Sequence, residues 1–456
     1  MKLFFEPETV AEIGATAGPM KPGYSLFQSL QETFGENFFP VNPKLDVIGN
    51  KQCYRGILDV PADIDVAVVF IPAAAVPEAL EQCGIKGIKR VIIESGGFAE
   101  AGAEGLALHE RCLAISKKYG MRLWGPNCMG LINVSRMKVL SFMGPMMWKG
   151  RFIAGKVSLV VQSGMLSAGF LLHILSKTPF GLSKVCSIGN KMDVDEVDVL
   201  EYLVNDPETG VIAMYLESIN RGRRFFELAK STSKPMVVLK SGRTSFGHKA
   251  AASHTAALSQ DDAVLDHALR QAGVVRVYGM NEMMDVARSF AVTEREPVKK
   301  ARVAVLSFSG GAGVVCSDDV ADYGMELARF SDETLAKMKS VFPAWMEPSN
   351  PVDTYPAIEK RGPTEVINVT VEAAMADPGV DAVYVHFFAP FVKIKLYDYD
   401  FLESVVKKHK KPMVAWTMGR GEVAAEIRQE LESRGICVVD EIAEGVRILA
   451  ALTMRR

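Results

Sequence analysis

The chain has 456 residues, enough for two to four domains, and 48% of them are apolar and 23% charged, as in a soluble globular protein. A formal net charge of -2 gives no basis for a nucleic-acid partner, and no apolar run is long enough to cross a membrane. Seven cysteines without a CxxC pair indicate neither a zinc site nor a disulfide framework. With no secretory signal at the N-terminus, they favour a reducing cytoplasm.

Strand-like and helix-like segments alternate along the first part of the sequence. The pattern predicts strands at residues 38–41, 64–71, 91–94 and 122–124, and helices at residues 77–83 and 103–119. This alternation predicts a doubly wound parallel sheet, whose ligands bind beyond the carboxyl ends of the strands. Glu12 departs from the pattern, because a buried first strand should be apolar; it predicts an altered or edge-exposed strand.

Two further α/β units follow. Residues 157–161 form an apolar strand that leads into Gln162-Ser163-Gly164, and residues 303–307 lead in the same way into Ser309-Gly310-Gly311. The similar openings indicate two related domains, with weaker segments at 134–156 and 293–300 as linkers. We therefore expect domains at residues 1–148, 149–296 and 297–456.

The first expected domain carries a candidate phosphate site. Gly14-Ala15-Thr16-Ala17-Gly18 follows a short strand, as expected for a turn that holds phosphate with backbone N–H groups, although it is not a GxGxxG motif. Lys44 follows the next strand, where an NAD site usually has an acid. A lysine there suits the phosphorylated ribose of CoA or NADP, whereas a lysine considered alone is more often a solvated loop cation.

Three later positions suit phosphoryl chemistry. Ser163 and Gly164 lie at a strand-to-helix junction, where free N–H groups attract anions; the alternative is a plain capping serine. Glu217 follows the apolar strand 211–216 and can orient an imidazole, although an isolated glutamate there is usually a surface residue. His254 lies in a run of small residues, 247–259, and a neutral imidazole on such a loop can attack phosphorus.

The order of these segments resembles the α subunit of the NDP-forming acyl-CoA synthetases, the superfamily of succinyl-CoA synthetase and ADP-forming acetyl-CoA synthetase. The resemblance covers nearly the whole sequence, and the third unit favours the acetyl-CoA synthetase branch. Val161 and Ala256 depart from the usual family residues. The motifs that carry the resemblance are Val41-Asn42-Pro43-Lys44, Trp124-Gly125-Pro126-Asn127-Cys128-Met129-Gly130, Gln162-Ser163-Gly164, Ser187-Ile188-Gly189-Asn190-Lys191, Ala252-Ser253-His254-Thr255 and Asn350-Pro351-Val352-Asp353.

The resemblance implies a Rossmann-like CoA-binding domain followed by two flavodoxin-like domains. It implies that His254 is phosphorylated, that Glu217 orients it, and that Ser163 and Gly164 receive phosphate. The residues it implies for the CoA site are Gly14, Thr16, Lys44, Pro72, Ser95, Gly96 and Asn127. It also implies a hetero-oligomer with an ATP-grasp β subunit that holds ATP or ADP and Mg²⁺, and a small carboxylic acid or its acyl-CoA as substrate.

Two other functions remain open from the sequence. A non-catalytic CoA- or acyl-CoA-binding protein would keep the fold without needing His254, Glu217 and Ser163. An NADP-dependent oxidoreductase would use the first domain and leave the histidine segment unexplained. The sequence does not identify the acyl group.

Overall fold

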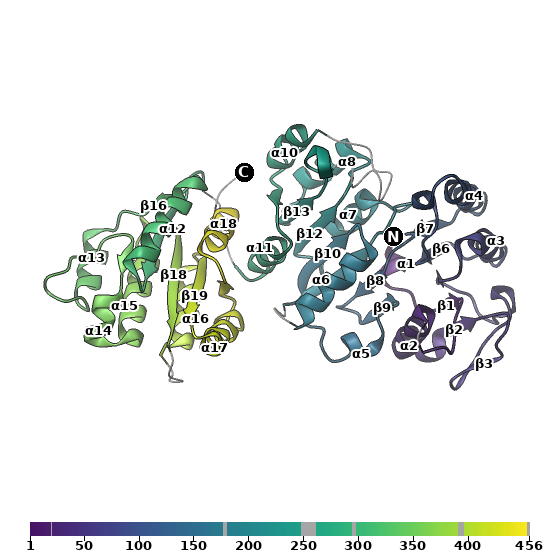
Figure 1. Cartoon of the computed structure of the whole chain (residues 1–456), viewed down its shortest axis with the longest axis horizontal. Helices are drawn as coiled ribbons and strands as arrows, with labels where there is room; N and C mark the ends of the chain where they lie inside the picture. Colours follow the sequence, from purple (N-terminus) through teal and green to yellow (C-terminus); the bar gives the residue numbers. More distant parts are fainter. Residues whose placement is uncertain (20, 177–179, 248–260, 294–297, 391–395, 454–456) are drawn as a thin grey trace. The chain divides into compact units, whose positions relative to one another are not determined.

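The computed structural model describes all residues except 20, 177–179, 248–260, 294–297, 391–395 and 454–456, and it divides into two compact units, Met1–Gly279 and Met280–Arg456 (Figure 1). The main sheets are largely parallel and are packed against helices. This confirms the predicted α/β class with a Rossmann-like sheet followed by flavodoxin-like sheets.

The first sheet of unit 1 has the strand order β2-β1-β5-β6-β7, and all its strands are parallel. Apart from Glu12, its buried residues are apolar on both faces, and helices cover both: Leu26 and Leu30 of α2 pack on one face, and Leu80 of α3 and Cys112 of α4 on the other. The predicted strands and helices of this region are confirmed. The bounds are β1 Val10–Ile13, β2 Phe38–Val41, β5 Val66–Val69, β6 Arg90–Ile93, β7 Arg122–Trp124, α2 Pro22–Phe34, α3 Val76–Ile85 and α4 Ala103–Tyr119.

The expectation that Glu12 marks an altered or edge-exposed strand is wrong. Strand β1 lies between β2 and β5, in regular register with both, and Glu12 is fully buried. Burial raises the pKa of the Glu12 carboxyl well above its ordinary value. Burial therefore favours the protonated form of Glu12, because an ionised carboxylate at this position would lose its hydration.

The second sheet of unit 1 has the order β14-β13-β12-β10-β11-β8-β9. Strands β10 to β14 are parallel, and the hairpin β8–β9 adds to β11 in the antiparallel sense. The strands are β8 Gly130–Asn133, β9 Lys138–Ser141, β10 Ala154–Val161, β11 Leu182–Ser187, β12 Val211–Leu216, β13 Met236–Lys240 and β14 Val275–Val277; a small hairpin pairs β3 Val47–Ile48 with β4 Lys51–Gln52. The helices are α1 Lys2–Phe5, α5 Pro145–Trp148, α6 Gly164–Ser176, α7 Glu196–Asn205, α8 Gly222–Ser231 and α10 Asp262–Gln271.

The two sheets of unit 1 share one continuous core. The Trp124 indole at the end of β7 donates to the Ser187 carbonyl at the end of β11, over 2.7 Å. Phe5 of α1 stacks on Tyr202 of α7 with ring centroids 4.1 Å apart. The carboxyl ends of β7 and β11 are therefore held together, and loops of both sheets can contribute to one site.

Unit 2 contains one six-stranded sheet in the order β16-β15-β18-β19-β20, with β17 beside β15. Strand β15 leads into α12 much as β10 leads into α6, and Ser309 caps α12, because its hydroxyl accepts the N–H of Ala312. The strands are β15 Arg302–Ser307, β16 Glu326–Leu327, β17 Val352–Asp353, β18 Ala382–Ala389, β19 Met413–Gly419 and β20 Cys437–Val439. The helices are α11 Met280–Val292, α12 Gly310–Asp322, α13 Asp332–Lys339, α14 Tyr355–Arg361, α15 Pro363–Ala376, α16 Tyr399–His409, α17 Gly421–Glu432 and α18 Ile442–Thr453.

The division into domains at residues 148 and 296 stays a proposal. In the structure β8 and β9 extend the second sheet from before residue 149, and α11 belongs to unit 2 from before residue 297. All seven cysteines are buried free thiols. Among the helices that the structure describes, none has the length and apolarity needed to cross a membrane.

Candidate active site

A cleft of about 930 Å³ opens at the carboxyl ends of β1, β2 and β5. Four of the sequence-predicted residues line it: Gly14, Thr16, Lys44 and Pro72. Because Lys21 and Arg55 also line it, three basic side chains face this cleft. Backbone N–H groups, a hydroxyl and several cations are the groups that bind phosphates, so the cleft fits a ligand rich in phosphate.

The turn after β1 is fixed by close backbone packing. Gly14 has a φ of +109°, and a Cβ atom there would lie 2.5 Å from the carbonyl oxygen of Phe70, so only glycine fits. The side chain of Asn42 donates to the Ala15 carbonyl over 2.7 Å and accepts the N–H of Lys44 over 2.8 Å. Asn42 thus joins the predicted phosphate turn to the loop that carries Lys44.

Lys21 and Arg55 are cleft residues that the sequence reasoning missed. The Arg55 side chain donates to Asp46 and, over 2.7 Å, to the carbonyl of Pro43, so it lies against the Lys44 loop. Arg55 follows the short β3–β4 hairpin, whose two-residue strands give no periodic signal in the sequence. The only signal in the sequence for Arg55 is that a basic residue lies downstream of the end of β2.

The other predicted CoA residues, Ser95, Gly96 and Asn127, form a second cluster that does not line this cleft. Ser95 accepts the N–H of Ile71 on its hydroxyl (3.1 Å) and the N–H of Asn127 on its carbonyl (2.8 Å). A Cβ atom on Gly96 would lie 3.1 Å from the Asn127 side chain. Ile71 and Pro72 both line the cleft, and Ile71 is bonded to Ser95. The cluster therefore lies beside one edge of the cleft.

The environment of the neighbouring Cys128 disfavours the thiolate form. The side chain is 2% exposed, and burial raises the pKa of its thiol. A thiolate, and not a thiol, is the reactive form of cysteine. The motif that contains Cys128 therefore contributes backbone and the Asn127 side chain to the site.

The start of α6 packs directly on this cluster. A Cβ atom on Gly164 would lie 3.4 Å from the carbonyl oxygen of Asn127, so the helix begins against the Asn127 loop. The Ser163 hydroxyl accepts the N–H of Leu166 over 3.4 Å, which is the geometry of a capping serine. The remaining free N–H groups of the first turn attract anions whether or not Ser163 also caps the helix. The structure thus places a helix start next to the second cluster.

Glu217 directly follows β12, as predicted, and is 8% exposed. Its backbone N–H donates to the side-chain oxygen of Gln162 over 2.9 Å, and the Tyr215 hydroxyl lies 3.4 Å from its carboxylate. Gln162 itself precedes Ser163. The predicted phosphate helix and the predicted orienting carboxylate are therefore joined through one buried amide side chain.

His254 lies outside the described residues, so its predicted place in the site stays a prediction. Within the described part of the sequence, no group of three or more His, Cys, Asp or Glu side chains is arranged to hold a metal ion. The described site thus combines a basic cleft, a polar cluster, a helix start and a carboxylate, all in unit 1.

Comparison with known proteins assigns this arrangement to a class. Residues 8–134 match the family model described as a CoA binding domain, and residues 154–290 match that of the succinyl-CoA ligase like flavodoxin domain. The chain is 37% identical over 455 residues to acetate–CoA ligase [ADP-forming] II of Archaeoglobus fulgidus, covering 98% of this chain, and 66% of that relative. It is 34% identical over 441 residues to the α subunit of acetate–CoA ligase [ADP-forming] II of Pyrococcus furiosus, covering 95% of this chain, and 93% of the subunit.

A solved structure agrees with this class. The acetyl-coenzyme A synthetase 1 of Ca. Korarchaeum cryptofilum, in complex with phosphate and ADP, matches with a TM-score of 0.87 and 29% identity, over 99% of this chain, and 96% of that one. The chain belongs to the ADP-forming acetate–CoA ligase family, as a counterpart of its α subunits, which confirms the resemblance noted in the sequence. It spans about two thirds of the length of the relative from A. fulgidus.

Proposed function

We propose that this chain is the α subunit of an ADP-forming acyl-CoA synthetase, which interconverts acyl-CoA, ADP and phosphate with the free acid, CoA and ATP. The observation that carries the proposal is the junction in unit 1, where Gly164 at the start of α6 contacts the Asn127 loop beside the predicted CoA residues. An acyl thioester held at that loop would lie next to N–H groups that bind phosphate.

Two chemical steps follow for this chain. A phosphate oxygen attacks the thioester carbonyl carbon, the C–S bond breaks, and CoA leaves as the thiol with a proton from phosphate. The neutral imidazole of His254 then attacks phosphorus, the bond between phosphorus and the acyl oxygen breaks, and the carboxylate leaves. Free N–H groups at Ser163 and Gly164 stabilise the phosphate charge, and Glu217 holds the imidazole in the reactive tautomer.

The phosphoryl group must then reach ADP, and we propose that a separate β subunit of the ATP-grasp type binds ADP or ATP and Mg²⁺. The P. furiosus relative is named as an α subunit, and this chain covers 93% of it. Seven buried free thiols suit a reducing compartment, so we place the complex in the cytoplasm. We also propose that residues 1–148, 149–296 and 297–456 form its three domains.

The test is activity with and without the partner. Purified by itself, the chain is expected to show no CoA- and acid-dependent ATP hydrolysis; with its β subunit it should form CoA thioesters from at least one acid in a panel of short, branched, aryl and dicarboxylic acids. Strong ATP hydrolysis by the isolated chain would contradict the division between subunits. Tight CoA binding without thioester formation or phosphorylation by the complex would favour the non-catalytic CoA-binding protein.

Lys44 provides a test of the CoA cleft itself. Lys44→Ala is expected to raise the Kd for CoA by about three- to tenfold at low salt, the effect of losing one exposed phosphate contact, with a smaller change at high salt. The measurement is titration calorimetry with CoA and with NADP. Lys149→Ala is the matched control, because this lysine is also exposed and pairs with Glu32 away from the cleft. An unchanged Kd for CoA, or tighter binding of NADP than of CoA, would contradict the assignment.

A further inference from the structure

The loop that begins at Glu217 is held by side chains from other elements. The side-chain oxygen of Gln162, after β10, accepts the N–H groups of both Glu217 (2.9 Å) and Ser218 (3.1 Å). The amide nitrogen of Gln162 donates to the Ser218 hydroxyl over 3.3 Å. One residue next to the predicted phosphate helix therefore fixes the first part of this loop.

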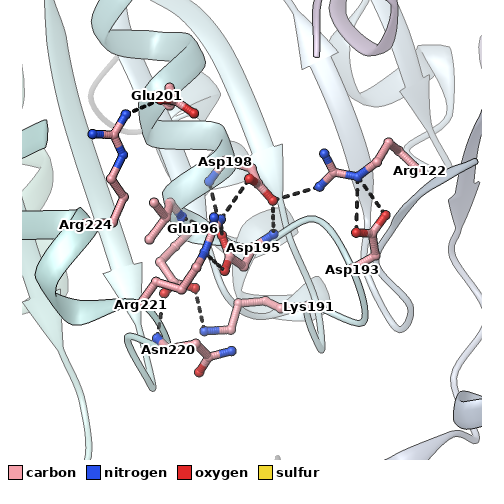
Figure 2. A network of polar contacts seen from close by, with 11 residues as sticks. Arg122, Lys191, Asp193, Asp195, Glu196, Asp198, Glu201, Asn220, Arg221 and Arg224 are labelled. Carbon is pink, nitrogen blue, oxygen red and sulfur yellow. Dashed lines mark hydrogen bonds and ion pairs between the residues drawn. The ribbon is translucent and has the colours of Figure 1, made fainter. Parts of the chain in front are cut away.

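A buried ion pair fixes the loop from the other side. The Lys191 ammonium lies 2.7 Å from the Glu196 carboxylate, and it donates to both the carbonyl and the hydroxyl of Ser218, each over 2.9 Å. The second Glu196 oxygen accepts the N–H of Asn220 over 2.8 Å (Figure 2). The pair thus holds the loop at Ser218 and at Asn220, immediately after Glu217.

Burial of the Lys191–Glu196 ion pair has a large desolvation cost, so the pair is expected to add little to the stability of the fold. The side chains of Lys191 and Glu196 are 2% and 0% exposed, so both charges lose their hydration, and a buried ion pair often contributes no more than an apolar pair of similar size. Lys191 also has a φ of 55°, a conformation that is uncommon for residues other than glycine. Besides their bond to each other, Lys191 and Glu196 form hydrogen bonds to the loop that contains Ser218 and Asn220.

We propose that Lys191 and Glu196 are positioning residues, which hold the Glu217 loop so that the Glu217 carboxylate meets the imidazole in phosphoryl transfer. The inference rests on the proposed function, in which Glu217 orients His254. Its physical basis is that hydrogen bonds to several backbone atoms fix the point from which the Glu217 side chain extends. Small displacements of an orienting group reduce rates strongly.

The test compares kcat, KM and stability in the assembled complex. Lys191→Met keeps the side-chain length and removes its donors; it should lower kcat for CoA thioester formation by about ten- to a hundredfold and leave KM for CoA nearly unchanged. The double variant K191M/E196Q removes both buried charges, so it is expected to fold better than K191M and to show the same loss of kcat.

A double-mutant cycle separates positioning from loss of structure. If Lys191 acts through Glu217, K191M should lower kcat little further in an E217Q background, because the two changes remove the same interaction. Lys184→Met is the control: Lys184 is fully buried in β11 and lies 2.8 Å from both Asp206 and Glu208. It should lower Tm, and its effect on kcat should multiply with that of E217Q.

Three outcomes would overturn the inference. The first is a K191M/E196Q complex that retains kcat, and the second is multiplication of the K191M and E217Q effects. The third is an E217Q complex with normal kcat, since Lys191 would then have no carboxylate to position. Only this third result also removes the role of Glu217 in the proposed function, so the two failures are distinguishable.

Discussion

Replacement of His254 by asparagine is expected to lower CoA thioester formation by the assembled complex by at least about a thousandfold. Asparagine has a similar size and polarity, but its amide nitrogen is not a nucleophile toward phosphorus. In the proposed reaction every phosphoryl group passes through this imidazole, so no second route maintains turnover. The measurement is the initial rate of thioester formation, together with labelling of the protein by radioactive ATP.

The control for this experiment is His267→Asn. His267 lies on the exposed side of α10, with Nδ1 2.7 Å from the Ala263 carbonyl oxygen, and no proposed step uses it. The wild type and H267N are expected to carry acid-labile, base-stable phosphate, and H254N none. Turnover by H254N at about a tenth of the wild-type rate or more would contradict the phosphohistidine mechanism.

The fold was predictable because the buried parallel strands are short and apolar. They are separated by helices whose apolar residues recur with the helical period. Residues 103–119 and 122–124 match α4 and β7 at both ends. The hairpin β8–β9 was not predicted, since β9 lies in the segment 134–156 that was interpreted as a linker. Its place beside β11 depends on a long-range pairing that no local pattern encodes.

The sequence predicted the positions of the candidate site residues Gly14, Lys44 and Glu217, because each follows a strand end. The rest depends on three-dimensional neighbours. Arg55 reaches the cleft through a small hairpin, and Lys191 contacts Ser218, which is 27 residues away in sequence. The spacing of residues in the sequence does not show that such residues are neighbours in the folded protein.

The prediction for Glu12 was wrong because it assumed a charged side chain. In the structure Glu12 is buried, and a second buried glutamate, Glu94, lies near it. Glu94, just after β6, is 4% exposed, and among the described residues the Glu12 carboxyl has no hydrogen-bond partner. Burial raises the pKa of Glu94 well above its ordinary value, and the nearby Glu12 raises it further, against a weaker opposing effect of the Phe142 N–H. Both acids are therefore expected to keep their protons to a higher pH than an ordinary glutamate does.

This arrangement makes the stability of unit 1 depend on pH. In the unfolded protein both carboxyls ionise near their ordinary pKa, whereas in the folded protein they keep their protons to a higher pH. The folded state then binds more protons, so the free energy of unfolding falls as pH rises, by about 1.4 kcal/mol per pH unit for each group in the window between its two pKa values. Below the ordinary pKa of glutamate both states are protonated, and this contribution to stability is fully present.

The variant E12Q/E94Q removes these two protonation equilibria and is expected to be more stable than the wild type at pH 8 by at least about 2 kcal/mol. Its advantage in Tm should shrink steadily toward pH 5, because the difference in protons bound by the folded and unfolded wild type narrows as the pH approaches the ordinary pKa of glutamate. Thermal melting of the two proteins between pH 5 and 9 measures this difference. Glu36→Gln is the control, since that side chain is fully exposed and should give a Tm profile parallel to the wild type. Parallel profiles for E12Q/E94Q would mean that the buried acids are ionised in the folded protein, with their charges stabilised by the surrounding structure.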